Sequence, residues 1–258
     1  MEKKPPGKTQ EEGNLDQNPF SFLLFRYWQA KAEGTLTLTW KDGRLSLPWL
    51  CGRPCCTMNF FSQNDIRKTL QEITSSSKKK EKADSDPHKK ADREFFKDVI
   101  QESSLPAADI WKRMEKTATD KLRILFDRDQ GSFHFRFKDK PDPADVLFFW
   151  DAPSLLLTGV EGMTNEKMLY FHLPVETESV CSLQVPFPNF LCLKPHQEYI
   201  LRLIEKHHVM SEVVLWSPLD KNDTLRILFL LKSAGVLTFS QNKETRSIPE
   251  VISPAVIH

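Results

Sequence analysis

Apolar and polar residues alternate over two separate stretches of the chain, and this period of two predicts β-strands. The first stretch covers residues 35–61 and contains Asp42-Gly43 between two alternating segments, which is a strong hairpin signal. The second stretch covers residues 131–137, and its apolar positions are Phe133, Phe135 and Phe137. We expect residues 35–61 to pair with residues 131–138 in a small antiparallel sheet that buries one face.

Apolar residues at helical spacing predict helices before and between these strands. Residues 20–31 show this spacing, and Gly34 follows them as a stop signal. A longer helix is predicted after Pro106, with apolar positions at Ile110, Met114, Ala118, Leu122 and Leu125. We also expect helices over residues 64–73 and 94–101. The elements together predict an α+β domain over residues 18–140, with helices that cover one face of the sheet.

A second domain is expected over residues 144–240. Its last part predicts a helix over 195–207, a short helix over 211–216, a helix over 224–232, and a strand after Gly235. Helix, short helix, helix and strand is the order of a winged helix. The sequence therefore predicts a mostly helical, winged-helix-like domain.

Three polar segments lack any apolar period. Residues 1–17 are interpreted as a disordered leader, and residues 241–258 as a flexible tail. Residues 74–93 contain seven Lys or Arg and four Asp or Glu, and they are interpreted as a charged, solvated insertion.

Composition narrows the classes of partner. The chain has 258 residues, 40% of them hydrophobic, and a formal net charge of +1, so no strong field favours nucleic acid or an anionic membrane. It shows no signal-peptide pattern and no apolar run near the ~18 residues that a spanning helix needs. We therefore expect a cytoplasmic protein with no membrane partner, in a compartment that keeps thiols reduced.

Cys51, Cys55 and Cys56 fall within six residues of the stretch LPWLCGRPCCTMNF and raise the question of a metal or redox site. A structural zinc site needs two ligand pairs at CxxC-like spacing, which this stretch lacks. Adjacent residues on a strand also point to opposite faces, so Cys55 and Cys56 cannot both reach one ion. We interpret Gly52-Arg53-Pro54 as a turn and the cysteines as packed neighbours, and we expect no metal, cofactor or catalytic residue.

The winged-helix outline offers one candidate site for nucleic acid. Residues 222–232 would be the recognition helix, with Lys221, Arg226 and Lys232 on its outer side. Residues 194–240 contain six Lys or Arg and five Asp or Glu, whereas DNA binding requires a marked basic face. Protein contact is therefore favoured over DNA binding.

Five segments resemble the PATAN domain of bacterial signalling proteins. FLLFRYWQAKAEGTLTLTW resembles its opening helix and strand, and DGRLSLPWLCGRPCC resembles its second and third strands with their joining turn. ATDKLRILFDRDQGSFHFRF is similar to its closing helix and strand, and LLLTGVEGM to the segment that follows. Residues 193–239 are similar to the winged-helix-like end of many bacterial members.

Two features depart from this family. Cys51 stands where the family often has Asp, and the insertion at residues 74–93 is unusually charged. The resemblance implies a signalling and protein-interaction module without known catalytic residues.

These observations predict a non-enzymatic bacterial regulatory or signalling adaptor that binds another protein. Exposed aromatic side chains would mark the contact surface, and Trp40, Trp49 and Trp216 are the candidates, although core packing is favoured for each of them taken singly. The alternative is a DNA-binding transcription regulator that uses Lys221, Arg226 and Lys232. A thiol- or metal-dependent enzyme is the third and least favoured class.

Overall fold

The structure is a computed structural model, and it describes residues 9–62, 65, 106–174, 179–183 and 192–241. The chain divides into two compact units, Met1–Met168 and Leu169–His258. The predicted domain boundary between residues 140 and 144 is therefore wrong. A proline-rich break at residues 141–143 resembles a linker, but the strand that follows it returns to the sheet of the first unit.

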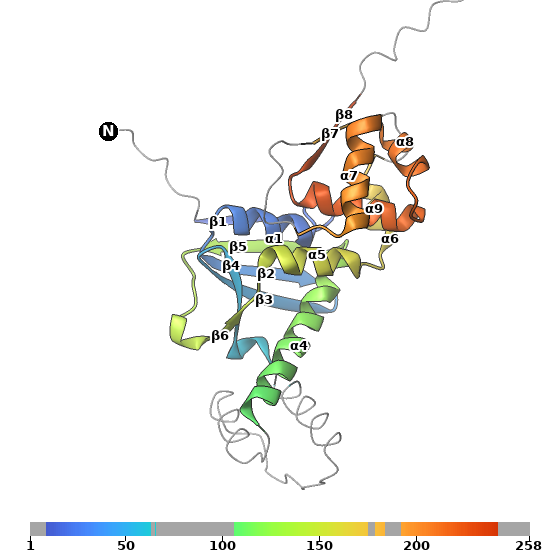
Figure 1. Cartoon of the computed structure of the whole chain (residues 1–258). Helices are drawn as coiled ribbons and strands as arrows, with labels where there is room; N and C mark the ends of the chain where they lie inside the picture. The colour runs from blue at the N-terminus through green and yellow to red at the C-terminus, as the bar shows by residue number, and fades with distance from the viewer. Residues whose placement is uncertain (1–8, 63–64, 66–105, 175–178, 184–191, 242–258) are drawn as a thin grey trace, which may run out of the picture. The chain divides into compact units, whose positions relative to one another are not determined.

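Six strands in the described part of the first unit form one antiparallel sheet, in the order β1-β5-β2-β3-β4-β6 (Figure 1). The strands are β1 (Gln10–Asn14), β2 (Gly34–Trp40), β3 (Gly43–Leu50), β4 (Arg53–Thr57), β5 (Ser132–Phe137) and β6 (Val146–Phe149). The predicted hairpin is confirmed, because Trp40 of β2 pairs with Gly43 of β3. The predicted pairing with residues 131–138 is also confirmed, since β2 lies directly beside β5.

Three long helices accompany this sheet: α1 (Phe20–Gln29), α4 (Ala107–Phe126) and α5 (Ala152–Glu161). The first two confirm the predicted helices over residues 20–31 and after Pro106. Short 3-10 helices cover Met58–Phe60 and Pro143–Asp145. The helices predicted over 64–73, apart from Asp65, and over 94–101 lie outside the described residues, as does the insertion at 74–93.

Aromatic side chains fill the space between the helices and the apolar face of the sheet. The ring of Tyr27 on α1 stacks on Phe135 of β5 at 4.1 Å between centroids, and meets Trp49 of β3 edge-on at 5.8 Å. Phe20 of α1 packs edge-on against Phe126 of α4 at 5.1 Å. All five side chains are almost fully buried. Their burial removes a large apolar area from water, so this layer contributes to the unit's hydrophobic stabilisation.

The predicted disordered leader over residues 1–17 is wrong from residue 9 onward. β1 pairs with β5, and Glu11 lies opposite Phe135. The Leu15 side chain is buried, and Arg26 Nη1 of α1 lies 2.5 Å from Glu11 Oε1. Residues 1–8 lie outside the described part. The segment QEEGN lacks an apolar period because an edge strand with solvated side chains is held mainly by its backbone ladder.

The turn between β3 and β4 consists of Cys51 and Gly52, because Leu50 pairs with Arg53. The predicted turn at Gly52-Arg53-Pro54 is therefore displaced by one residue. Cys51 and Gly52 have φ values of 51° and 77°, the left-handed pair that two-residue hairpin turns require. The Gly52 N–H donates to the Ala32 carbonyl at 2.9 Å, which fastens the turn to the connection after α1.

The second unit contains α7 (Pro195–His207), α8 (Met210–Leu215) and α9 (Lys221–Ser233), and α6 (Glu166–His172) crosses the boundary between the units. β7 (Ser179–Leu183) pairs with β8 (Leu237–Gln241). The predicted helices and the strand after Gly235 are confirmed, and the predicted tail lies outside the described residues after Gln241. The chain is thus α+β, and its winged-helix character stays a prediction. No helix among the described residues has both the length and the apolar character needed to cross a bilayer.

Gly52→Ala should destabilise the first unit by about 2 kcal/mol, because a non-glycine residue at positive φ is strained. A Cβ at this position would also lie only 2.8 Å from Lys31 Cα and from the Trp28 carbonyl oxygen. Gly162→Ala is the matched control, since Gly162 has a φ of −86° and its nearest Cβ contact would be 3.4 Å. Urea unfolding should show a change below about 1 kcal/mol for the control. Equal unfolding free energies for the two variants would contradict this account of the turn.

Candidate functional site

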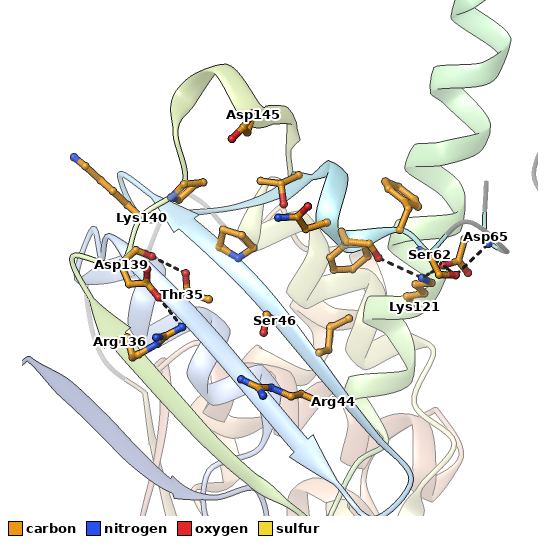
Figure 2. Close-up of a pocket in the computed structure, with 17 residues that line it drawn as sticks. Thr35, Arg44, Ser46, Ser62, Asp65, Lys121, Arg136, Asp139, Lys140 and Asp145 are labelled. Atoms are coloured by element: carbon orange, nitrogen blue, oxygen red, sulfur yellow. Dashed lines mark hydrogen bonds and ion pairs between the residues drawn. The ribbon is translucent and has the colours of Figure 1, made fainter. Parts of the chain in front are cut away.

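A cavity of about 800 Å³ lies on the polar face of the sheet (Figure 2). Alternation along β2 and β3 explains its polarity: Leu36 is buried beneath the helices, whereas Thr35 and Ser46 line the cavity. The connection from β5 to β6 forms a second wall, to which Asp139 and Asp145 contribute. Sequence periodicity could indicate the polar face, but not that this connection folds over it.

Most cations that line this cavity are already neutralised. Arg136 pairs with Asp139 at 2.8 Å, Lys121 with Asp65 at 2.6 Å, and Lys140 with Glu33 at 3.1 Å. Burial raises the pKa of Asp65, but hydrogen bonds from Lys121 and Ser62 outweigh burial and hold that pKa below its usual value. Within the described lining, Arg44 is the cation without an ion pair. The cavity therefore offers a single uncompensated guanidinium rather than a strong field for a charged substrate.

The three clustered cysteines do not converge on one point. The Cys51 thiol is exposed and donates to Glu33 Oε1 at 3.3 Å. Cys55 and Cys56 are buried, and their thiols donate to the carbonyls of Pro48 at 3.4 Å and Thr57 at 3.7 Å. No group of three His, Cys, Asp or Glu in the described residues is placed to hold a metal ion.

The environments of these thiols also oppose thiolate formation. Burial raises the pKa of Cys55 to about 12 and shifts the pKa of Cys56 further in the same direction. The hydrogen bond to the Glu33 carboxylate raises the pKa of Cys51. Packing of Cys55 and Cys56 at strand positions is confirmed, whereas Cys51 is an exposed turn residue instead of a packed one.

The three candidate tryptophans lie in different environments. Trp49 is 0% exposed beneath the helices, so its predicted role in partner contact is wrong. The pattern Leu47-Pro48-Trp49 already placed it on the same face as the buried Leu47. Trp40 is half-buried over the hairpin, and the Arg128 guanidinium lies 5.2 Å from its ring centroid. Trp216 is 61% exposed.

Trp216 belongs to an exposed apolar group in the second unit. Leu215, the last residue of α8, is 75% exposed, because Met210 and Val213 occupy the buried side of this helix. The Trp216 ring stacks on the His207 ring, with 6.0 Å between centroids and 12° between planes. Tyr199, also on α7, is exposed as well. We call the three residues His207, Leu215 and Trp216 the Trp216 surface.

Polar contacts hold the stacked pair in place. His207 Nδ1 lies 3.3 Å from Glu212 Oε2, and the backbone N–H of Trp216 donates to the Glu212 carbonyl at 2.9 Å, which fixes the backbone from which the indole projects. The indole is therefore exposed while it rests against the imidazole ring of His207. The sequence indicated Trp216 but not Leu215, whose exposure depends on which face of α8 is packed.

The three predicted DNA contacts are each engaged within the protein. Lys221 lies 5.0 Å from the Tyr170 ring centroid, and Arg226 pairs with Asp223 at 2.5 Å. Lys232 is half-buried, donates to the His172 carbonyl, and has its pKa lowered by burial. These cations do not form the free basic face that a recognition helix needs in the major groove.

α9 itself is buried along most of its length, including Leu225, Leu228 and Phe229. A recognition helix must leave one side open to base edges, and this helix instead packs against α7, α8 and β8. The burial therefore disfavours the DNA-binding alternative.

Comparison with known proteins found no matching family model, no matching curated protein and no matching solved structure. The resemblance to the PATAN domain accordingly stays a prediction.

Thiol labelling of the folded chain by a disulfide reagent should modify Cys51 and Cys192 and leave Cys55, Cys56 and Cys181 unmodified until denaturant is added. At a pH below the pKa of the Cys51 thiol, Glu33→Gln should speed alkylation of Cys51. Removing the carboxylate lowers that pKa and so increases the thiolate fraction. Mass spectrometry of labelled peptides measures both effects. Rapid labelling of Cys55 or Cys56 in the folded chain would favour the reactive-thiol class instead.

Proposed function

We propose that this protein is a non-enzymatic bacterial regulatory or signalling adaptor that acts by binding another protein. The observation that carries the proposal is the Trp216 surface, where Leu215 and Trp216 are 75% and 61% exposed. Large apolar side chains gathered on a surface are typical of contact sites. The resemblance to the PATAN domain supports the same class of function.

The contact between the Trp216 and His207 rings favours binding. An indole held against His207 loses little conformational freedom when a partner covers it, so more of the contact energy appears as affinity. Tryptophan is also enriched among the residues that dominate binding energy at protein interfaces. Trp216 is therefore the expected anchor of the contact.

Charged residues of both signs border this surface. Glu212 contacts His207, and Lys206 precedes His207 in the chain; both are exposed, so charges of both signs lie beside the stacked pair. An apolar centre with a mixed polar rim suits a protein partner, whereas a nucleic acid requires a basic face. The partner we propose is accordingly a folded protein with an apolar patch of its own.

Affinity capture from a nuclease-treated bacterial lysate, followed by mass spectrometry, should identify one or a few specific proteins. With a purified partner, Trp216→Ser or Leu215→Ser should weaken binding by at least about 30-fold, the effect of losing a residue worth about 2 kcal/mol. Both side chains are exposed, so the unfolding free energy should change by less than about 0.5 kcal/mol. Isothermal titration calorimetry measures the affinity, and urea unfolding measures the stability.

Ile124→Ser is the matched control, because Ile124 is 53% exposed but lies on α4 of the first unit. It should bind the partner like the native chain. Native-like binding by Trp216→Ser would contradict the proposed contact surface. If a parallel capture from an untreated lysate yields only nucleic acid and its associated proteins, and the nuclease-treated lysate yields none, the DNA-binding regulator would replace the adaptor.

A further inference from the structure

The two edges of the sheet differ in how they are protected. At one edge, β1 carries Glu11 and Glu12, and charged side chains discourage pairing with another chain. At the other edge, β6 has the sequence VLFF and contains only apolar residues. Phe149 is 36% exposed at the end of this strand. β6 is therefore the edge that lacks a charged side chain.

The register of β6 directs the backbone of Phe149 outward. The Trp150 N–H donates to the Pro54 carbonyl at 3.0 Å, and Cys56 pairs with Phe148. In an antiparallel ladder, hydrogen-bonded pairs alternate with pairs that are not hydrogen-bonded. The pair between Cys55 and Phe149 is thus of the second kind, so the N–H and C=O of Phe149 point away from β4.

Nothing in the described part of the chain pairs with this outer side of β6. Along this strand Val146, Leu147 and Phe148 are half-buried, and the Arg53 guanidinium lies over the Phe149 ring at 4.7 Å. An extended peptide could exchange two backbone hydrogen bonds with Phe149 and cover the exposed part of this ring.

Charge near the strand selects the kind of peptide. Asp142 and Asp145 precede β6 and Asp151 follows it; all three are exposed, and they outnumber Arg53, whose guanidinium lies over the Phe149 ring. In an antiparallel dimer of two β6 strands, the acidic end of each copy would lie near Asp151 of the other, and like charges at such positions are destabilising. Basic residues at the ends of a bound peptide would instead be attracted.

We propose that β6 binds an extended segment of a partner protein by strand addition, and that this segment has alternating apolar side chains with basic residues at its ends. The site lies in the first unit, is separate from the Trp216 surface, and does not depend on it. If no peptide binds to β6, the adaptor proposal still stands. If the Trp216 surface binds no partner, the β6 proposal still stands.

The test uses the full chain and a fluorescein-labelled peptide, Lys-Arg-Val-Thr-Val-Thr-Val-Lys, followed by fluorescence anisotropy. Phe149→Pro removes the outward N–H while leaving the Phe148 ladder bonds, and edge strands tolerate proline at such a position. It should weaken peptide binding about tenfold more than Phe149→Thr, which loses the ring but keeps the N–H. Trp216→Ser should leave peptide binding unchanged.

A second pair of peptides tests the mode without altering the protein. Methylating the central backbone nitrogens of the peptide should abolish binding, and replacing its basic ends by Glu should weaken it several-fold. On binding the unmodified peptide, the Phe149 amide should exchange more slowly with deuterium. These three results are the ones that strand addition by a basic peptide requires.

Three results would overturn the proposal. One is equal binding of the methylated and unmethylated peptides, and another is no binding at peptide concentrations up to about 1 mM, the weakest affinity worth calling specific. The third is a concentration-dependent dimer of the chain that Phe149→Pro converts to monomer, since a second copy would then occupy the edge.

Discussion

The stacking of Tyr27 between the sheet and the helices determines how the first unit is built. Its ring covers Phe135 and meets Trp49, so one face of the sheet is sealed against water by aromatic area. The opposite face carries polar side chains such as Thr35 and Ser46, and the cavity lies there. The open edge at β6 follows from the strand order, in which β6 comes last.

Burial on one side also explains where the surfaces available for binding lie. In the first unit, charged side chains in the cavity largely neutralise one another, which leaves the uncharged backbone edge of β6 as the more distinctive feature. In the second unit, α9 is enclosed and its cations are engaged, while the end of α8 exposes Leu215 and Trp216. Both units therefore present features suited to protein contact.

Local patterns predicted the parts of the fold that depend on local sequence. The hairpin around Asp42-Gly43, the alternating phenylalanines of β5 and the helices of the second unit follow from turn chemistry and periodicity. β1 was missed because its side chains carry no pattern, and β6 because it pairs with a strand about 90 residues earlier in the chain. Such pairings depend on tertiary contacts that no short window of sequence contains.

The candidate site was less predictable than the fold for a related reason. Composition alone does not distinguish one tryptophan from another. Trp49 is enclosed and Trp216 is exposed, and this difference depends on how whole helices and strands pack. Likewise, Lys232 is a plausible DNA contact by spacing, but its amine donates to the carbonyl of His172. Leu215 carries no sequence signal at all, since its exposure depends on Met210 and Val213 taking the buried side of a short helix.

The most direct test of the adaptor account is hydrogen–deuterium exchange of the full chain, alone and bound to its purified protein partner. The account predicts that binding slows exchange over residues 207–216, where His207 and Trp216 meet, while the amides of α9 stay unchanged. Protection confined to α9, or a bound chain with no added protection over residues 207–216, would contradict the claim that the Trp216 surface is the contact.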